Sequence, residues 1–158
     1  MPKRLPSFFH DLDQSTGFLL WQASNHWQRR QRRALAPLGL THVQFFLLAS
    51  VVSLSAAGEP VSQAALARHA RVDPMTTSQV LRALQTRKLI RRVPHPTDPR
   101  AKALLSTAAG RKLARDAAFV VDSAERELLD ALGSDRARLA PLLAALAPSE
   151  HPEGESAT

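Results

Sequence analysis

The sequence predicts a mainly α-helical protein that carries one small β-hairpin. Apolar side chains recur at helical spacing over much of the chain, and glycine and proline residues divide these stretches into separate helices. Two short strand-like runs stand on either side of a loop that three prolines keep out of helix. The apolar share of 44% excludes a wholly disordered chain, and a length of 158 residues fits one domain.

The helices and strands are expected in a fixed order. Helices are predicted at about 12–36, 41–54, 62–69, 73–88, 107–132 and 135–147, and strands at 89–93 and 101–105. Thr41, Asp73 and Thr107 are residue types that cap helix N-termini, and Pro74 suits the first turn after Asp73. The order helix, helix, short helix–turn–helix, hairpin, two helices describes a winged helix-turn-helix inside an otherwise helical protein.

Positive charge is concentrated in one segment. Between Val61 and Leu105 the chain has nine lysines and arginines against two aspartates, an excess of seven. This excess equals the net charge of the whole protein, +7, so the remaining residues are neutral together. A uniformly solvated surface would not segregate charge in this way. The segment is therefore predicted to meet a polyanion.

The helix that begins at Asp73 has two different faces. At 100° per residue its apolar side chains fall on one side, and hydroxyls, an amide and one guanidinium fall on the other, with no acid. Glutamine and arginine can bind adenine and guanine bidentately, and serine or threonine can reach bases or phosphates. The alternative is an ordinary amphipathic helix with a solvated outer face. The absence of acids and the basic hairpin beside it favour a helix that reads DNA.

The hairpin supplies the second part of the predicted interface. Arginine favours a narrow minor groove, which Arg100 at the end of the loop could enter, and Asp98 could pair with Arg100 and hold it. The alternative is a surface turn with an incidental salt bridge of little energetic weight. The predicted DNA contacts are Met75, Thr76, Ser78, Gln79, Arg82, Thr86, Arg92, His95, Asp98, Arg100 and Lys102.

With these motifs the chain resembles the MarR family of bacterial transcriptional regulators. The resemblance spans about residues 12–147. Its specific parts are the recognition helix at 73–84 and the wing at 94–102, which contains the D-x-R at 98–100. Further matches lie at 38–45, at 63–67 and in the T-x-x-G at 107–110. Two positions depart from the family pattern: Ser106 replaces an apolar residue, and Lys88 stands where glycine is common.

The resemblance implies a homodimeric, ligand-responsive repressor that binds a pseudo-palindromic operator with half-sites about 10 bp apart. It implies a single domain over 1–148, with dimerisation helices at 12–36 and 107–147 and a DNA-binding part at 41–106. The tail at 149–158 has nothing to bury and is expected to be disordered. The residues expected at the dimer interface are Leu19, Leu20, Leu139, Leu142, Leu143 and Leu146. Packing of this apolar stripe within one chain is the alternative.

A small aromatic effector is a further implication of the resemblance. The residues that would line its pocket are Trp21, His26, Trp27, His42 and Phe45, for which core packing is the alternative interpretation. The arginine-rich run at 28–33 is expected to be a solvated helix end, with a peripheral phosphate contact as the alternative.

Other functional classes find little support in the sequence. There is no cysteine, the six histidines show no metal-ligand spacing, and no nucleophile motif or phosphate loop is present, so we expect no metal, no cofactor and no enzyme activity. No signal peptide or membrane span is expected, which predicts a cytoplasmic protein. The alternative function is an RNA-binding or protein-interaction module; the absence of aromatic residues from 61–105 argues against base stacking on RNA.

Overall fold

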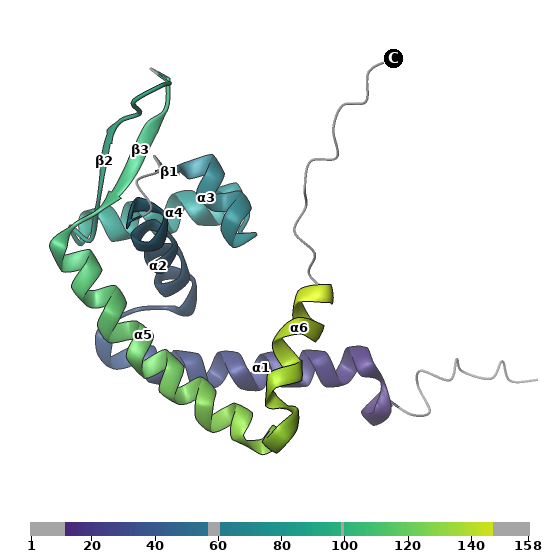
Figure 1. Cartoon of the computed structure of the whole chain (residues 1–158). Coiled ribbons are helices and arrows are strands. Elements are labelled where there is room, and N and C mark those ends of the chain that lie inside the picture. Colours follow the sequence, from purple (N-terminus) through teal and green to yellow (C-terminus); the bar gives the residue numbers. More distant parts are fainter. Residues whose placement is uncertain (1–11, 57–60, 99, 147–158) are drawn as a thin grey trace, which may run out of the picture. The chain divides into compact units, whose positions relative to one another are not determined.

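The computed structural model describes residues 12–56, 61–98 and 100–146 (Figure 1). The predicted tail at 149–158 and the first eleven residues lie outside this part of the chain. The chain forms two compact units, one up to Glu125 and one from Arg126 onward.

The first unit has the predicted winged helix-turn-helix order. Its helices are α1 (Thr16–Leu35), α2 (His42–Ala56), α3 (Gln63–Ala70), α4 (Pro74–Thr86) and α5 (Ala108–Leu129), of which the last runs on into the second unit. Its strands are β1 (Val61–Ser62), β2 (Ile90–Pro94) and β3 (Lys102–Ser106), which pair antiparallel in the order β1-β3-β2. The mainly helical class with a small hairpin is confirmed, and the two-residue strand β1 was not predicted because it is too short to show alternation.

The helix starts follow from side-chain caps. Thr41 Oγ1 accepts a hydrogen bond from the Gln44 N–H at 3.2 Å, and Gln44 Oε1 accepts one from the Thr41 N–H at 3.1 Å, which is a capping box. Ser62 Oγ caps α3 through the Ala65 N–H at 3.1 Å, and Asp73 Oδ1 caps α4 through the Thr76 N–H at 2.8 Å. The predicted caps at Thr41 and Asp73 are confirmed.

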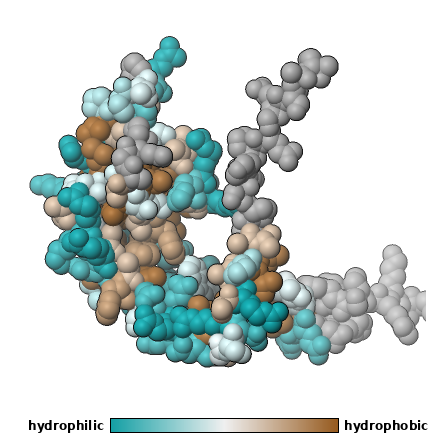
Figure 2. Space-filling view, in the orientation of Figure 1, coloured by the Kyte–Doolittle hydropathy of each residue, from teal (hydrophilic) through white to brown (hydrophobic). Residues whose placement is uncertain are grey.

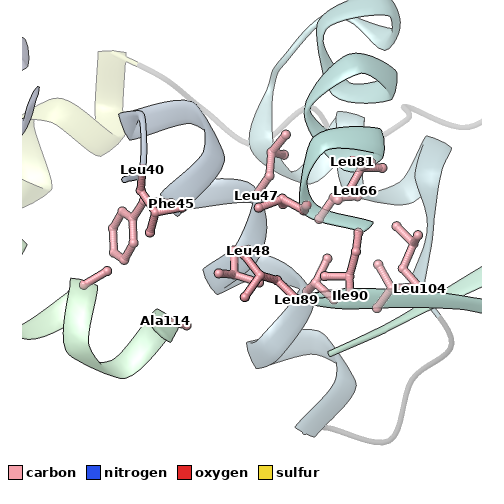
Figure 3. Close-up of a cluster of buried hydrophobic side chains, with 14 of the residues drawn as sticks. Leu40, Phe45, Leu47, Leu48, Leu66, Leu81, Leu89, Ile90, Leu104 and Ala114 are labelled. Atoms are coloured by element: carbon pink, nitrogen blue, oxygen red, sulfur yellow. The ribbon is translucent and has the colours of Figure 1, made fainter. Parts of the chain in front are cut away.

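One apolar core lies between α2, α3, α4 and the sheet, and it continues to α5. Figure 3 shows Leu47 of α2 beside Leu66 of α3 and Leu81 of α4, and Leu48 of α2 beside Ile90 of β2. These side chains are fully buried. Burial of one such leucine side chain stabilises the folded protein by about 1.5–3 kcal/mol relative to exposure. These contacts therefore stabilise the helix-turn-helix within one chain.

The junction between α4 and α5 is held by Thr107. The Thr107 hydroxyl donates to the Lys88 carbonyl at 2.8 Å and accepts from the Gly110 N–H at 3.0 Å, so the predicted cap of α5 is confirmed. A Cβ on Gly110 would lie 2.0 Å from the Leu89 carbonyl oxygen, so only glycine fits there. The T-x-x-G motif therefore joins the end of the helix-turn-helix to the start of α5.

Both departures from the family pattern are accommodated. Lys88 takes the left-handed conformation, with φ 57°, that glycine favours, and the Leu89 N–H donates to the Leu84 carbonyl at 3.0 Å, so α4 still ends in a Schellman motif. Ser106 is buried, pairs with Ile90 across the sheet, and its carbonyl accepts from Arg111 Nη1 at 3.0 Å. The second wing strand is complete.

The second unit contains the helix α6 (Arg136–Leu146), which a 3-10 segment at Asp130–Asp135 precedes. Ion pairs join Arg136 to Asp130 at 3.3 Å and Arg138 to Asp135 at 3.2 Å, all exposed. α6 buries no residue. Within the described chain no single helix is long and apolar enough to cross a membrane; the segments 16–38 and 42–56 reach that size only as a pair bent by 72°.

Candidate nucleic-acid interface

Helix α4 presents the two faces that its sequence predicted. Thr77, Leu81 and Leu84 are fully buried, and Val80 is half-buried. On the other side Met75 is 72% exposed, and Gln79, Arg82 and Thr86 are exposed as well. Thr76 and Ser78 lie half-buried between the two faces. The helix thus has one side packed on the helix-turn-helix core and one side free of it.

The exposed side of α4 is ordered by contacts along the helix. Arg82 Nη2 donates to Ser78 Oγ at 3.1 Å, and the Thr86 hydroxyl donates to the Arg82 carbonyl at 3.0 Å. The guanidinium keeps further N–H groups that can bind guanine O6 and N7. Gln79 offers an amide for adenine, and Met75 an apolar group for a thymine methyl.

The first turn of α4 carries the capping aspartate. Hydrogen bonds from Thr76, from its side chain first and then from its backbone N–H, hold the pKa of the Asp73 carboxyl below its ordinary value of 3.8. Asp73 is therefore ionised at neutral pH and keeps the Thr76 N–H occupied. The Asp73 carboxylate therefore acts as the N-cap of α4.

The wing loop is held by its own side chains. The Asp98 carboxylate accepts from the Arg100 N–H at 2.9 Å, and the Asp98 carbonyl accepts from the Ala101 N–H at 3.1 Å. Asp98 therefore holds Arg100 by its backbone, whereas the sequence suggested a pairing of the two side chains. The guanidinium of Arg100 is exposed. Figure 2 shows hydrophilic residues at the end of the wing.

His95 is part of the same loop. Its Nδ1 accepts hydrogen bonds from the N–H groups of Thr97 at 3.4 Å and Asp98 at 3.2 Å. An accepting Nδ1 leaves the proton of a neutral ring on Nε2, which can donate to a phosphate. Lys102 is exposed on β3, next to the loop.

The two adjacent arginines of β2 have different surroundings. Arg92, a predicted DNA contact, is half-buried, and its Nη2 donates to Gln63 Oε1 of α3 at 3.1 Å. Arg91, which was not predicted as a contact, is exposed. The alternation of a strand contains the signal for this difference, because buried Ile90 and Arg92 share one face and Arg91 lies on the other.

A second arginine near α4 is also engaged. Arg87, at the C-terminus of α4, donates from Nη1 to the Gly39 carbonyl at 2.8 Å. Gly39 has φ 63° and ends the turn between α1 and α2. The end of α4 is therefore tied to the turn between α1 and α2. The sequence did not predict this contact.

Some of the predicted effector-binding residues come together. Trp27 of α1 lies edge-on to His42 at 6.5 Å between ring centroids and is stacked on Phe46 at 6.1 Å. Phe45, 5.1 Å from Phe46, is buried in the core. Phe46 was not predicted; its place beside Phe45 on an apolar helix gave no signal of its own.

The other two predicted effector residues lie elsewhere on α1. Trp21 is 60% exposed and stacks on Phe18 at 5.7 Å, and His26 is exposed. Gln31, one turn after Trp27, is 1% exposed, and neither atom of its amide has a hydrogen-bond partner in the described part of the chain. The aromatic cluster is thus Trp27, His42, Phe45 and Phe46, with a buried amide close by in sequence.

The predicted interface leucines are exposed in the single chain. Leu19 and Leu20 are about half-exposed, and Leu139 is half-buried. Leu142, Leu143 and Leu146 of α6 have exposed fractions between 44% and 72%, and apolar residues are visible on α6 in Figure 2. Solvent-facing leucines in this number on one short helix are typical of a surface that another chain covers.

The remaining predicted features can be placed briefly. In the arginine-rich run Arg29, Arg32 and Arg33 are exposed, whereas Arg30 Nε donates to the Ala124 carbonyl of α5 at 3.4 Å. Among the residues that the structure describes, no three His, Cys, Asp or Glu side chains gather as they would around a metal ion.

Comparisons with known proteins show the family of the chain. A model of the MarR family matches residues 40–102. An uncharacterised HTH-type transcriptional regulator of Bacillus subtilis is 43% identical over 104 residues, which are 66% of this chain and 71% of the relative. An HTH-type transcriptional repressor of Mycobacterium tuberculosis is 32% identical over 126 residues, 80% of this chain and 88% of the relative.

The fold is also that of a solved DNA complex. The transcriptional repressor CouR, bound to a 23-mer DNA duplex, matches with a TM-score of 0.77 and 28% identity over 87% of this chain and 95% of CouR. With a helix-turn-helix of this geometry and relatives that are transcriptional regulators, the chain belongs to the MarR family and is a DNA-binding transcriptional regulator.

Proposed function

We propose that the protein is a homodimeric repressor that places α4 of each copy in the major groove of a pseudo-palindromic operator and the wing in the adjacent minor groove. The carrying observation is the exposed face of α4: Met75, Gln79 and Arg82 stand clear of the core, with no acid among them. The relatives that match most of the chain include a transcriptional repressor.

The contacts divide into three kinds in this proposal. Gln79, Arg82 and Met75 read base edges, and Thr76, Ser78 and Thr86 contact bases or phosphates beside them. His95 and Lys102 bind phosphates along the wing. Arg100, whose backbone is held by Asp98, enters the minor groove, where the negative potential favours arginine. Affinity then comes mainly from phosphates and specificity from α4.

Two copies are proposed because one chain leaves its C-terminal helix uncovered. The leucines of α6, with Leu19 and Leu20 of α1, form the proposed interface between copies. The proposal assigns residues 41–106 to DNA and the helices at 12–36 and 107–147 to dimerisation. A two-fold dimer requires a two-fold operator with half-sites about one helical turn apart. No catalytic step is part of the proposal, because the relatives are regulators.

The effector is proposed to act at the aromatic cluster. Trp27, His42 and Phe46 offer flat apolar surfaces for an aromatic molecule, and Gln31 holds an unpaired amide one turn away. Because Arg87 ties the end of α4 to the Gly39 carbonyl, a ligand that moves the start of α2 also moves the recognition helix. The distance between the two α4 helices would then no longer match the distance between the half-sites of the operator.

The test is selection of bound duplexes from a random pool by the full-length protein. We expect one sequence with two-fold symmetry and half-sites about 10 bp apart. For a dimer that makes about six to ten phosphate contacts, the affinity for this duplex should fall roughly 10³–10⁵-fold between 50 and 200 mM salt. Asymmetric or unrelated selected sequences would contradict the proposal.

A competition assay separates this function from RNA binding. Structured RNA of the same length should fail to displace the selected duplex at matched concentration, because α4 fits the major groove of B-form DNA and residues 61–105 contain no Phe, Trp or Tyr for stacking. Equal competition by RNA would favour the alternative function.

A further inference from the structure

A side-chain hydrogen bond crosses the sheet and links the wing to the helix-turn-helix, in addition to the backbone pairing of β3 with β1. Arg92 belongs to β2, and Gln63 is the first residue of α3. Arg92 Nη2 donates to Gln63 Oε1 at 3.1 Å, although 29 positions separate the two residues in sequence. The contact therefore connects the hairpin to the helix that packs directly against α4.

The strand register explains why this arginine points inward. Arg92 lies opposite Leu104 of β3, and Leu104 lies opposite Val61 of β1. Residues directly opposite each other share one face of a sheet, and both Leu104 and Val61 are buried. Neighbouring strands are about 4.8 Å apart, so the long side chain of Arg92 extends over Leu104 towards Gln63, which follows β1. Its guanidinium thus donates to Gln63 of the same chain.

The surroundings of Arg92 make loss of this hydrogen bond destabilising. Its Nε is buried and has no hydrogen-bond partner among residues 12–56, 61–98 and 100–146. Removing one acceptor costs more free energy at a half-buried guanidinium with few partners than at an exposed guanidinium, where water replaces the acceptor. Arg91, on the opposite face, is exposed and has no such constraint.

We propose that Arg92 is a positioning residue: with Gln63 it fixes the wing relative to α3 and α4, and Arg100 reaches the minor groove only while this pair is in place. The inference rests on the proposed contact between the wing and DNA. It assigns Arg92 a role other than the direct DNA contact predicted from the sequence, and it gives Gln63 a function in specificity through the wing.

The decisive variant is Gln63→Met, which removes the acceptor and leaves the charge of Arg92 in place. Operator affinity, measured by fluorescence anisotropy with the selected duplex, should fall about 3- to 10-fold. The slope of log affinity against log salt should fall as well, because a displaced wing also loses the phosphate contacts proposed for His95 and Lys102. Arg92→Met should give the same loss and the same slope as Gln63→Met, whereas a direct phosphate contact of Arg92 would lower its slope by about one more.

A double-mutant cycle with Arg100→Ala separates positioning from general destabilisation. If Gln63 and Arg92 position the wing and with it Arg100, Gln63→Met should weaken binding less in the Arg100→Ala background than in the wild type. Melting temperatures of all variants, measured without DNA, control for folding. A merely structural role would weaken both backgrounds equally.

Each outcome decides between the two proposals. Undiminished loss from Gln63→Met in the Arg100→Ala background, wild-type affinity of Gln63→Met, or a lower salt slope for Arg92→Met than for Gln63→Met would each overturn the positioning role. If Arg100→Ala itself bound like the wild type, the proposed minor-groove contact of the wing would be wrong, and the positioning role would fall with it while the contacts of α4 still stood.

Discussion

The helix-turn-helix and α6 use their leucines in opposite ways. Leu66 of α3, Leu81 of α4 and Leu104 of β3 are buried by their own chain, whereas Leu142 and Leu146 of α6 remain largely exposed. The first region therefore has a core within one chain, and the second gains one only from another surface. This difference indicates that folding of the DNA-reading part and assembly of the protein can be disrupted separately.

The largest effect is expected from charges on α6. The double variant Leu142→Glu/Leu146→Glu should abolish dimerisation, because two carboxylates cannot be buried at an apolar interface without partners. Operator affinity should fall at least about 100-fold, since the second half-site is then bound without the advantage of linkage. Analytical ultracentrifugation measures the mass and anisotropy measures the affinity.

Circular dichroism provides the control for this variant. The helix-turn-helix should keep its helical signal and a cooperative melt, since its core does not use α6. A double variant that stays dimeric would show that the interface lies elsewhere, and one that unfolds completely would show that α6 supports the first unit within the same chain.

The next effect tests the junction that joins the helix-turn-helix to α5. Gly110→Ala should lower the free energy of unfolding by about 3 kcal/mol, because the new methyl would meet the Leu89 carbonyl oxygen at 2.0 Å. Gly17→Ala is the matched control: its methyl would come no closer than 4.0 Å to Ser15 Oγ, so stability should stay within about 1 kcal/mol of the wild type. Urea unfolding followed by circular dichroism measures both, and equal effects would contradict the structure of the junction.

A smaller effect of opposite sign is expected at Gln31. Gln31→Leu should raise the free energy of unfolding by about 1 kcal/mol, because it replaces a buried amide without hydrogen-bond partners by an apolar side chain of similar size. Gln28→Leu serves as the comparison. Gln28 lies three residues before Gln31, is half-buried and donates to Ser24 Oγ at 3.4 Å, so its replacement should not stabilise the protein. Destabilisation by Gln31→Leu would mean that the amide is satisfied in solution, as by a bound ligand.

The smallest effect concerns pH and the cap of α4. The pKa of Asp73 is lowered in the folded protein, so its ionised form contributes stability above the unfolded pKa, and this contribution is lost as the pH falls through the folded value, below about 4. Asp73→Asn keeps a capping oxygen and cannot titrate. The difference in stability between wild type and variant should therefore be constant from pH 7 to 5 and shrink at pH 3. A difference that grows on acidification would contradict the direction of the shift.

Periodicity predicted what depends on local sequence. The faces of α4 followed from the spacing of Thr77, Leu81 and Leu84, and the caps at Thr41 and Asp73 followed from side-chain chemistry within one turn. The end of α4 also depends on a local conformation, since Lys88 takes the left-handed backbone conformation that glycine favours. These features need no knowledge of distant residues.

Contacts between distant residues could not be predicted in the same way. The bond from Arg92 to Gln63 depends on the order of three strands, one of which has only two residues. The aromatic cluster includes Phe46 and leaves Trp21 outside, because the direction in which α1 meets α2 decides which rings approach. Asp98 holds the backbone of Arg100, which requires the turn geometry of the wing.

Arg82 is the residue through which base reading by the exposed face of α4 can be measured. The wild type and Arg82→Ala are titrated against the selected operator and against duplexes changed at one symmetric base pair of each half-site. If Arg82 reads a guanine, the variant should lose about 1–3 kcal/mol of discrimination at that one position and keep it at the others. Unchanged discrimination at every position would show that Arg82 reads no base pair.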